Sequence, residues 1–275
     1  MKIWLAALLG FLQGITEFLP VSSSGHLAVF QRFFGLDEVD MFFDVLLHFA
    51  TLIAIIIFYR REIGDMLREI VGFFRDLRHP SPEAGEPKPA RRLVLMLIIA
   101  TLPLFLILPL SDKIEALSNN TMFVGIAFLL TGVILYFSDR LRIGHKNAGS
   151  VTVSDAVKIG FAQAIATLPG ISRSGTTIAA GMAVGLDRSF AVNFSFLMSL
   201  PAVLGATILE TKKALEAGIA VSALPAYLVG MLIAGVVGYF SIKLLKMIAE
   251  RGKFGKFCYY CFGIGILTIV LTVVL

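Results

Sequence analysis

The chain has 275 residues, of which 57% are hydrophobic and only 16% are charged. Soluble domains usually carry about 25% charged residues, and here the charges stand in blocks between long apolar stretches. The composition excludes an ordinary soluble domain and predicts an all-α, polytopic membrane protein. The net charge of +5 does not indicate a nucleic-acid partner, because Lys and Arg gather in the cytoplasmic loops of membrane proteins.

The first apolar segment is interrupted by polar residues and by helix breakers. Gln13 and Glu17 lie one helical turn apart, and Pro20 and Gly25 end the helical pattern before a second apolar piece runs to about residue 34. Neither piece has the roughly 20 apolar residues that a membrane span needs. The sequence therefore predicts a re-entrant helical hairpin, whose turn must be buried in protein or line a wet cavity.

The next part of the chain predicts one span and a cytoplasmic insert at residues 60–92. The span covers about residues 41–59. Apolar residues then recur at helical spacing among charges from Glu62 to Leu77, which predicts an amphipathic helix in the membrane interface. A solvated linker with four prolines follows at residues 78–90.

Five more spans and a second broken segment complete the chain. The spans are expected at about residues 92–110, 119–137, 190–209, 222–242 and 257–275, which gives six in total. The broken segment, residues 156–186, predicts a second re-entrant hairpin, with Pro169 and Gly170 at its centre. Cys258 and Cys261 are too few for a four-ligand zinc site, and we expect them to be small buried side chains.

The two hairpin turns repeat one another. The stretch Gln13–His26 is matched 150 positions later, so that Gln163, Ser172, Ser174 and Gly175 align with Gln13, Ser22, Ser24 and Gly25. If both segments are hairpins, 18 Lys and Arg lie in connections on one side of the membrane and five on the other. This asymmetry predicts that the basic side is cytoplasmic, that both termini lie outside and that the first hairpin opens outward. The single membrane domain would then consist of two halves, residues 1–150 and 151–275, in an inverted-topology repeat.

The two turns carry the residues with chemical potential. In an inverted repeat they would meet near the midplane, each presenting Ser-x-Ser-Gly at a helix N-terminus, where backbone amides favour anions. Gly25 and Gly175 would let the backbone approach a ligand. An arginine inside the membrane, Arg173, predicts an anionic partner. With Glu17, Ser22 to Ser24 and His26, the set suits phosphoryl transfer or hydrolysis.

Structural roles could account for some of these residues one at a time. Membrane serines often satisfy backbone carbonyls, His26 could lie at an interface, and Glu17 with Arg173 could form a buried ion pair. Asp44 and His48, one turn apart on the first full span, could line the site or play no part in it. All of these roles being structural at once, on two matching turns, is the less economical interpretation.

Two motifs resemble those of the bacterial undecaprenyl-pyrophosphate phosphatases of the bacitracin-resistance family. One runs from Gln13 through Glu17 to His26, and the other, Pro-Gly-x-Ser-Arg-Ser-x-x-Thr, runs from Pro169 to Thr177. Gln13 stands where other members have Glu, which removes a possible metal ligand or proton carrier. The resemblance implies catalytic roles for Glu17, Ser23, His26 and Arg173. The positions expected to contact substrate are Gln13, Ser22, Ser24, Gly25, Gly170, Ser172, Ser174, Gly175 and Thr177.

The resemblance also implies a reaction, a cofactor and a location. The expected reaction removes the terminal phosphate of undecaprenyl pyrophosphate and regenerates the carrier lipid of cell-wall synthesis. A divalent cation, Mg²⁺ or Ca²⁺, is expected, with Glu17 as its ligand. The expected setting is the bacterial inner membrane, with the site open to the outer face, membrane lipids around it and a homodimer as a possible assembly.

Two functional alternatives stay open at this point. A polyprenyl-phosphate transporter or flippase could use the same inverted-repeat site, whereas a purely structural membrane scaffold would leave Glu17 and Arg173 unexplained. Within the phosphatase, either Ser23 or His26 could be the nucleophile.

Overall fold

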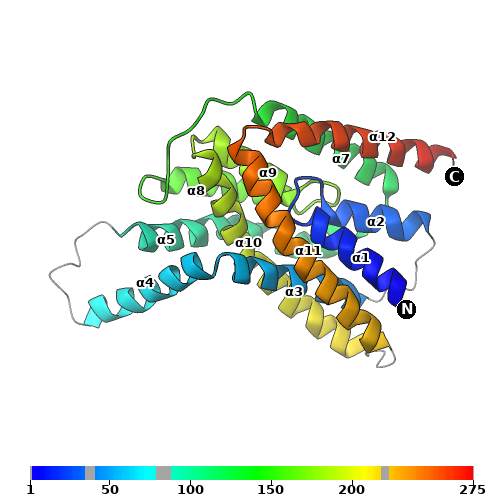
Figure 1. Cartoon of the computed structure of the whole chain (residues 1–275), viewed down its shortest axis with the longest axis horizontal. Coiled ribbons are helices and arrows are strands. Elements are labelled where there is room, and N and C mark those ends of the chain that lie inside the picture. The colour runs from blue at the N-terminus through cyan, green and yellow to red at the C-terminus, as the bar shows by residue number, and fades with distance from the viewer. Residues whose placement is uncertain (1, 35–40, 79–87, 218–222, 275) are drawn as a thin grey trace.

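The computed structural model describes residues 2–34, 41–78, 88–217 and 223–274, and helices dominate it (Figure 1). The predicted linker at residues 78–90 lies largely outside the described residues. The α-helices are α1 (Ile3–Thr16), α2 (Ser23–Phe33), α3 (Met41–Phe58), α4 (Arg60–Arg78), α5 (Pro89–Thr101), α6 (Ser111–Leu117), α7 (Thr121–Ser138), α8 (Val153–Ile165), α9 (Arg173–Ala183), α10 (Arg188–Ala217), α11 (Leu224–Glu250) and α12 (Phe257–Val274). Three 3₁₀ turns join them: η2 (Leu102–Leu106), η3 (Leu108–Leu110) and η5 (Phe254–Lys256).

The all-α membrane class predicted from the sequence is confirmed. Among the described residues, five helical segments are long and apolar enough to cross a membrane: Pro89–Leu117, Thr121–Ser138, Arg188–Leu209, Leu224–Glu250 and Phe254–Val274. A sixth span is counted only if α3 and α4 are taken as one bent element. Each of the six predicted spans thus has a helix.

The predicted span at residues 92–110 is not one continuous α-helix. Helix α5 ends at Thr101, and the 3₁₀ turns η2 and η3 follow at Pro103 and Pro109. Proline removes a backbone donor and clashes with the preceding turn, so the α-helical hydrogen bonds cannot continue. The connection between this span and the one predicted at 119–137 contains the short helix α6.

Helix α4 leaves α3 at a sharp angle of 81°. The chain bends at Tyr59, which is fully buried and donates a hydrogen bond from its hydroxyl to Oδ1 of Asn193 at 3.0 Å. The apolar run ends there, and α4 is amphipathic. It exposes Leu67, Ile70, Val71, Phe73 and Phe74, which are the side chains expected of a helix lying in a membrane interface. The helix is confirmed, and its depth in the membrane stays a prediction.

The two broken segments each form a pair of short helices joined by a turn. Helices α1 and α2 make the first pair, and α8 and α9 make the second. Helix α8 begins with a capping box in which Thr152 and Asp155 bond to each other's backbone N–H. Burial would raise the pKa of Asp155, but hydrogen bonds from Lys146 and Thr152 hold this pKa below its usual range. The second pair is therefore fixed at its first turn.

The first helix of each half of the chain packs against a helix of the other half. Helix α1 packs chiefly on α11, and α8 packs on α5. A Cβ added to Gly10 of α1 would lie 2.3 Å from the carbonyl oxygen of Gly230, and one added to Gly160 of α8 would lie 2.4 Å from that of Ala100. Gly10 and Gly160 are 150 positions apart, like the two turns. Such reciprocity is what a two-fold relation between the halves would produce, and their opposite orientation in a membrane stays a prediction.

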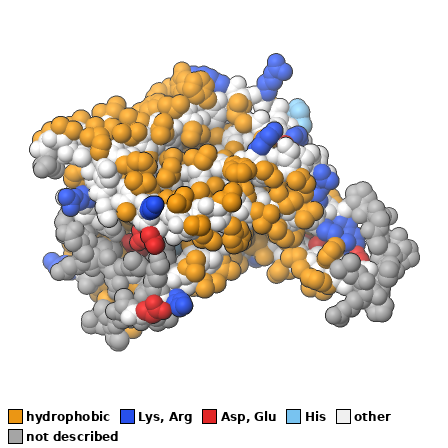
Figure 2. Space-filling model, turned by 180° about the vertical axis from the view of Figure 1, so that it is seen from behind, with side chains coloured by type: hydrophobic (Ala, Val, Ile, Leu, Met, Phe, Trp, Pro, Cys, Tyr) orange, Lys and Arg blue, Asp and Glu red, His pale blue; other side chains and the backbone are white. Residues whose placement is uncertain are grey.

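The outer surface suits a hydrocarbon environment. Figure 2 shows hydrophobic side chains spread over most of the visible described surface, with few charged groups between them. Both termini lie at one end of the long axis of the molecule, opposite the far end of α4 and the start of α5 (Figure 1). This arrangement is compatible with termini on a common side of the membrane.

Candidate active site

The turns are built alike and begin their helices in the same way. Ser22 and Ser172 are N-caps whose hydroxyls accept hydrogen bonds from the backbone N–H of Gly25 and Gly175, at 3.3 and 3.0 Å. Each cap satisfies an amide that the helix leaves unpaired. Ser23 and Arg173 therefore occupy the same position, the first residue of α2 and of α9. The backbone at Ser22 has a positive φ of 69°, a conformation that costs free energy outside glycine.

The turns also pack against one another. A Cβ added to Gly25 would lie 2.9 Å from Cα of Gly170, and one added to Gly175 would lie 3.1 Å from Cβ of Pro20. Ser174 donates a hydrogen bond from its hydroxyl to the carbonyl of Leu19 at 3.3 Å. These glycines are needed for the approach of the two turns, and their expected contact with substrate stays a prediction.

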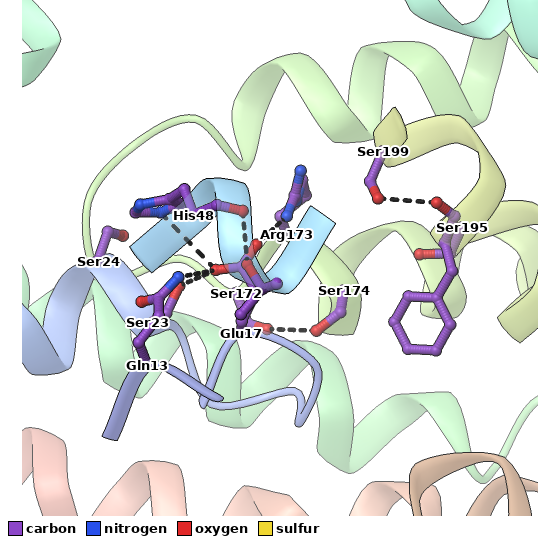
Figure 3. A network of polar contacts seen from close by, with 12 residues as sticks. Gln13, Glu17, Ser23, Ser24, His48, Ser172, Arg173, Ser174, Ser195 and Ser199 are labelled. Carbon is purple, nitrogen blue, oxygen red and sulfur yellow. Dashed lines mark hydrogen bonds and ion pairs between the residues drawn. The ribbon is translucent and has the colours of Figure 1, made fainter. Parts of the chain in front are cut away.

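Glu17 lies at the centre of a polar cluster drawn from both turns (Figure 3). Arg173 donates from Nη2 to Oε1 of this carboxylate. The other oxygen, Oε2, accepts from the hydroxyl of Ser23 at 2.6 Å and from Nε2 of Gln13 at 3.1 Å. The structure thus brings together four of the residues predicted from sequence, although Arg173 is 156 positions away from Glu17 along the chain.

The electrostatics of the cluster explain why these groups stay together. The side chain of Glu17 is only 4% exposed, whereas that of Arg173 is 26% exposed. A buried carboxylate is costly unless it is paired and fully hydrogen-bonded. Arg173 supplies the opposite charge, and the amide of Gln13 and the hydroxyl of Ser23 supply the further hydrogen bonds. One guanidinium N–H is used by Glu17, and the planar group has five. The partly exposed side of Arg173 is therefore equipped to bind a further anion.

His26 does not point into this cluster. Its Nδ1 lies 2.7 Å from the carbonyl oxygen of Ser22, and its Nε2 lies 2.7 Å from the hydroxyl of Tyr260 on α12. The ring stacks on Tyr260 and meets Phe128 of α7 edge-on. The side chain is 7% exposed. These contacts hold the His26 ring away from Glu17, and the catalytic role expected for His26 stays a prediction.

The imidazole near Glu17 belongs to His48 of α3. Its Nε2 lies 3.8 Å from Oε2 of Glu17, its Nδ1 lies 2.9 Å from the carbonyl of Asp44, and the side chain is one third exposed. Asp44 in turn accepts a hydrogen bond from Gln31 of α2. The i,i+4 spacing of Asp44 and His48 was the signal in the sequence, but no periodicity could show that α3 passes beside the first turn.

The other hydroxyl residues predicted to contact substrate fall into two groups, buried and exposed. Ser22, Ser172 and Thr177 are buried and bond within the turns, and Thr177 reaches the carbonyl of Arg173 at 2.8 Å and the hydroxyl of Ser195 at 2.6 Å. These hydroxyls hold the first turn of each helix. Ser24, by contrast, is exposed, with its hydroxyl 3.4 Å from that of Ser22. It is the predicted serine that is free to meet a ligand without rearrangement.

The protein groups around Glu17 do not form a cation site by themselves. In the described part of the chain, no three His, Cys, Asp or Glu side chains gather in a way that could hold a metal ion. Both carboxylate oxygens of Glu17 already accept hydrogen bonds from protein donors. Mg²⁺ is commonly bound by one or two carboxylates together with substrate phosphates, so a cation here would need the oxygens of a bound phosphate.

Fold and site together define an all-α membrane protein in which a buried carboxylate–guanidinium pair lies beside two helix N-termini. The bacitracin resistance protein BacA family matches residues 6–267 of this sequence. The chain belongs to this family.

The curated relatives match over nearly the full chain. An undecaprenyl-diphosphatase of Carboxydothermus hydrogenoformans is 40% identical over 274 residues, covering 98% of both chains. An undecaprenyl-diphosphatase of Methanosphaera stadtmanae is 38% identical, with the same coverage. The undecaprenyl-diphosphatase 4 of Bacillus thuringiensis subsp. konkukian is 37% identical over 98% of this chain and 97% of its own.

Proposed function

We propose that this protein hydrolyses undecaprenyl diphosphate to undecaprenyl phosphate and inorganic phosphate within the membrane. One observation carries the proposal: the hydroxyl of Ser23, the carboxylate of Glu17 and the guanidinium of Arg173 meet at hydrogen-bonding distance, although they come from two separate turns. Full-length relatives that are 36–40% identical bear the name undecaprenyl-diphosphatase, which supports this substrate.

Diphosphate binding follows from the charges and amides around the cluster. The diphosphate group brings negative charge to the N-termini of α2 and α9, where helix dipoles favour anions. Arg173 binds phosphate oxygens with the N–H groups that Glu17 does not use, and its planar fork suits two oxygens at once. Ser24, exposed beside Ser23, supplies a further donor. The polyprenyl chain stays between the helices, in contact with membrane lipids.

The chemistry requires a nucleophile and a proton acceptor, and the cluster holds both. Ser23 attacks the terminal phosphorus as its proton passes to Oε2 of Glu17, which lies 2.6 Å away. The bond between that phosphorus and the bridging oxygen breaks, and undecaprenyl phosphate leaves. Water then attacks the phosphoserine, inorganic phosphate leaves, and Glu17 returns the proton to Ser23. Arg173 stabilises the charge that develops on the phosphoryl oxygens.

Cofactor, assembly and orientation are part of the proposal. Glu17, together with oxygens of the bound diphosphate, would hold a divalent cation, Mg²⁺ or Ca²⁺, which would offset the charge of the diphosphate. The site opens to the outer face of the bacterial inner membrane, and both termini lie on that side, as the 18 to five split of Lys and Arg predicts. A homodimer stays a prediction from the family resemblance.

Release of phosphate in detergent tests the proposal. Purified protein is given a polyprenyl diphosphate without any membrane gradient, and inorganic phosphate is measured with and without a chelator. Wild type should release phosphate, Arg173→Ala should lose nearly all activity, and chelator should lower the rate. Wild-type protein that binds the lipid but releases no phosphate contradicts the proposal and favours the transporter alternative, since a carrier needs no phosphatase activity.

A further inference from the structure

Helix α12 reaches the first turn through two adjacent residues. The hydroxyl of Tyr260 lies 2.7 Å from Nε2 of His26, and Sγ of Cys261 lies 3.6 Å from the carbonyl oxygen of Pro20. Tyr260 is half exposed, but its ring stacks on the imidazole at a centroid distance of 5.6 Å and an interplanar angle of 10°. One helix therefore contacts the turn on both sides of Ser23, at Pro20 and at His26.

The partners of His26 fix its tautomer. The carbonyl oxygen of Ser22 can only accept a hydrogen bond, so Nδ1 of His26 carries the hydrogen. In the neutral ring Nε2 then has the lone pair, which accepts the hydroxyl hydrogen of Tyr260. Both ring nitrogens are occupied, and neither faces Glu17 or Arg173. An imidazole held in this way has no lone pair available for attack on a phosphate.

The same contacts place the nucleophile of the proposed reaction. His26 donates a hydrogen bond from Nδ1 to the carbonyl of Ser22, and Ser22 is the residue with positive φ that directly precedes Ser23. That backbone conformation persists only where the surroundings enforce it. Tyr260 of α12 therefore contacts the imidazole of His26, and the imidazole contacts the backbone of Ser22. This backbone directs the Ser23 hydroxyl towards Glu17.

We propose that Tyr260 is a positioning residue that acts through His26, and that His26 links Tyr260 to the Ser23 turn without exchanging protons or phosphoryl groups with the substrate. The proposal rests on the proposed phosphatase function. Because the pair orients the attacking hydroxyl and leaves Arg173 untouched, its loss should lower kcat and leave KM nearly unchanged.

The test compares four single variants and one double variant in the detergent phosphatase assay. Tyr260→Phe keeps the stacked ring and removes the hydroxyl, and we expect kcat to fall about three- to tenfold, the range for one lost hydrogen bond. Tyr259→Phe is the matched control, because Tyr259 is the neighbouring tyrosine and is 72% exposed. This variant should match wild type. His26→Asn, which keeps an N–H donor near the Nδ1 position that bonds to Ser22, should retain clearly more activity than His26→Ala.

The double variant distinguishes linkage from independent roles. If Tyr260 acts through His26, adding Tyr260→Phe to His26→Ala should cause no further loss. Losses that multiply, a Tyr260→Phe enzyme equal to wild type, or a His26→Asn enzyme as inactive as His26→Ala would overturn the inference. Thermal unfolding of each variant in detergent shows whether a loss reflects misfolding. Inactive wild-type protein would instead refute the phosphatase proposal itself.

Discussion

Ser23 and Arg173 occupy equivalent positions in two related turns, yet they contribute opposite kinds of chemistry. Each is the first residue of a helix behind a serine cap. One presents a hydroxyl and the other a cation, and both bind the single carboxylate of Glu17. A buried carboxylate stays ionised, and can therefore accept a proton, only while the arginine offsets its charge. Altering any one of the three side chains should therefore remove most of the contribution of the other two to catalysis.

Ser23→Ala tests the nucleophile at the residue scale. We expect phosphate release to fall by about 100-fold or more, because loss of a covalent step leaves only the binding and electrostatic contributions. Ser154→Ala, at an exposed position early in α8, should keep wild-type kinetics. Near-normal turnover by the Ser23 variant would mean that water or another group attacks the phosphorus.

Arg173→Lys tests whether geometry matters beyond charge. A lysine keeps one positive charge but cannot bind Glu17 and two phosphate oxygens with a planar fork. We expect kcat/KM to fall roughly 10- to 100-fold, the equivalent of one charge-assisted hydrogen bond. The exposed Arg142 provides the control substitution, Arg142→Lys. Unchanged kinetics of Arg173→Lys would reduce the role of Arg173 to a simple counter-charge.

At the scale of elements, close helix contacts determine where the turns lie. Helix α1 carries Gln13 and leads directly into Glu17, and Gly10 and Gly14 bring it against the backbone of α11. Helix α7 holds the second turn, because Thr131 donates to the carbonyl of Gly170 and accepts from the amide of Ser172. The site thus depends on packing between helices that carry no catalytic group, as is usual for small-residue contacts in membranes.

Gly10→Ala should destabilise the protein through this packing. The new methyl group would lie 2.3 Å from a backbone oxygen of Gly230, so one helix must shift. We expect a loss of about 1–3 kcal/mol in the free energy of unfolding, seen as a lower midpoint of thermal unfolding in detergent. Gly263→Ala on α12, where nothing lies within 4 Å of an added Cβ, should show no loss. Equal midpoints for the two variants would refute the tight contact.

At the scale of the whole molecule, the arrangement of helices favours a membrane setting, while the direction of insertion rests on charge. The apolar surface of Figure 2 and the candidate spans require a lipid environment. The 18 to five distribution of Lys and Arg predicts which face is cytoplasmic. The proposed outward opening of the site depends on that orientation.

Cysteine labelling in intact cells tests the orientation. Asn119, before α7, and His145, after it, are both exposed and should lie on opposite sides of the membrane. A membrane-impermeant maleimide should label Asn119→Cys in intact cells and His145→Cys only after lysis. The native Cys258 and Cys261 are buried, at 1% and 0% exposure, so their background should be low. The reverse labelling pattern would place the site on the cytoplasmic side.

Most of the membrane helices could be predicted from sequence, and so could the four side chains that meet at Glu17. Long apolar stretches have one stable form in a bilayer, and polar residues inside them are costly enough to indicate function. Glu17 and Arg173 were singled out in this way, whereas the choice of Ser23 among its neighbouring serines came from the family resemblance. The break of the predicted span at residues 92–110 by Pro103 and Pro109 was missed because a hydropathy window does not register single prolines.

The sequence by itself determined that this is a helical membrane protein with two matching polar turns, since composition and repetition are local properties of the chain. Only the tertiary structure decided which side chains face which. Sequence named His26 as an imidazole of the site, and the structure shows that His26 bonds to Tyr260 while His48 of α3 lies beside Glu17. Side-chain direction at a turn depends on the backbone angle at Ser22 and on helices more than 200 residues away along the chain, which no local pattern encodes.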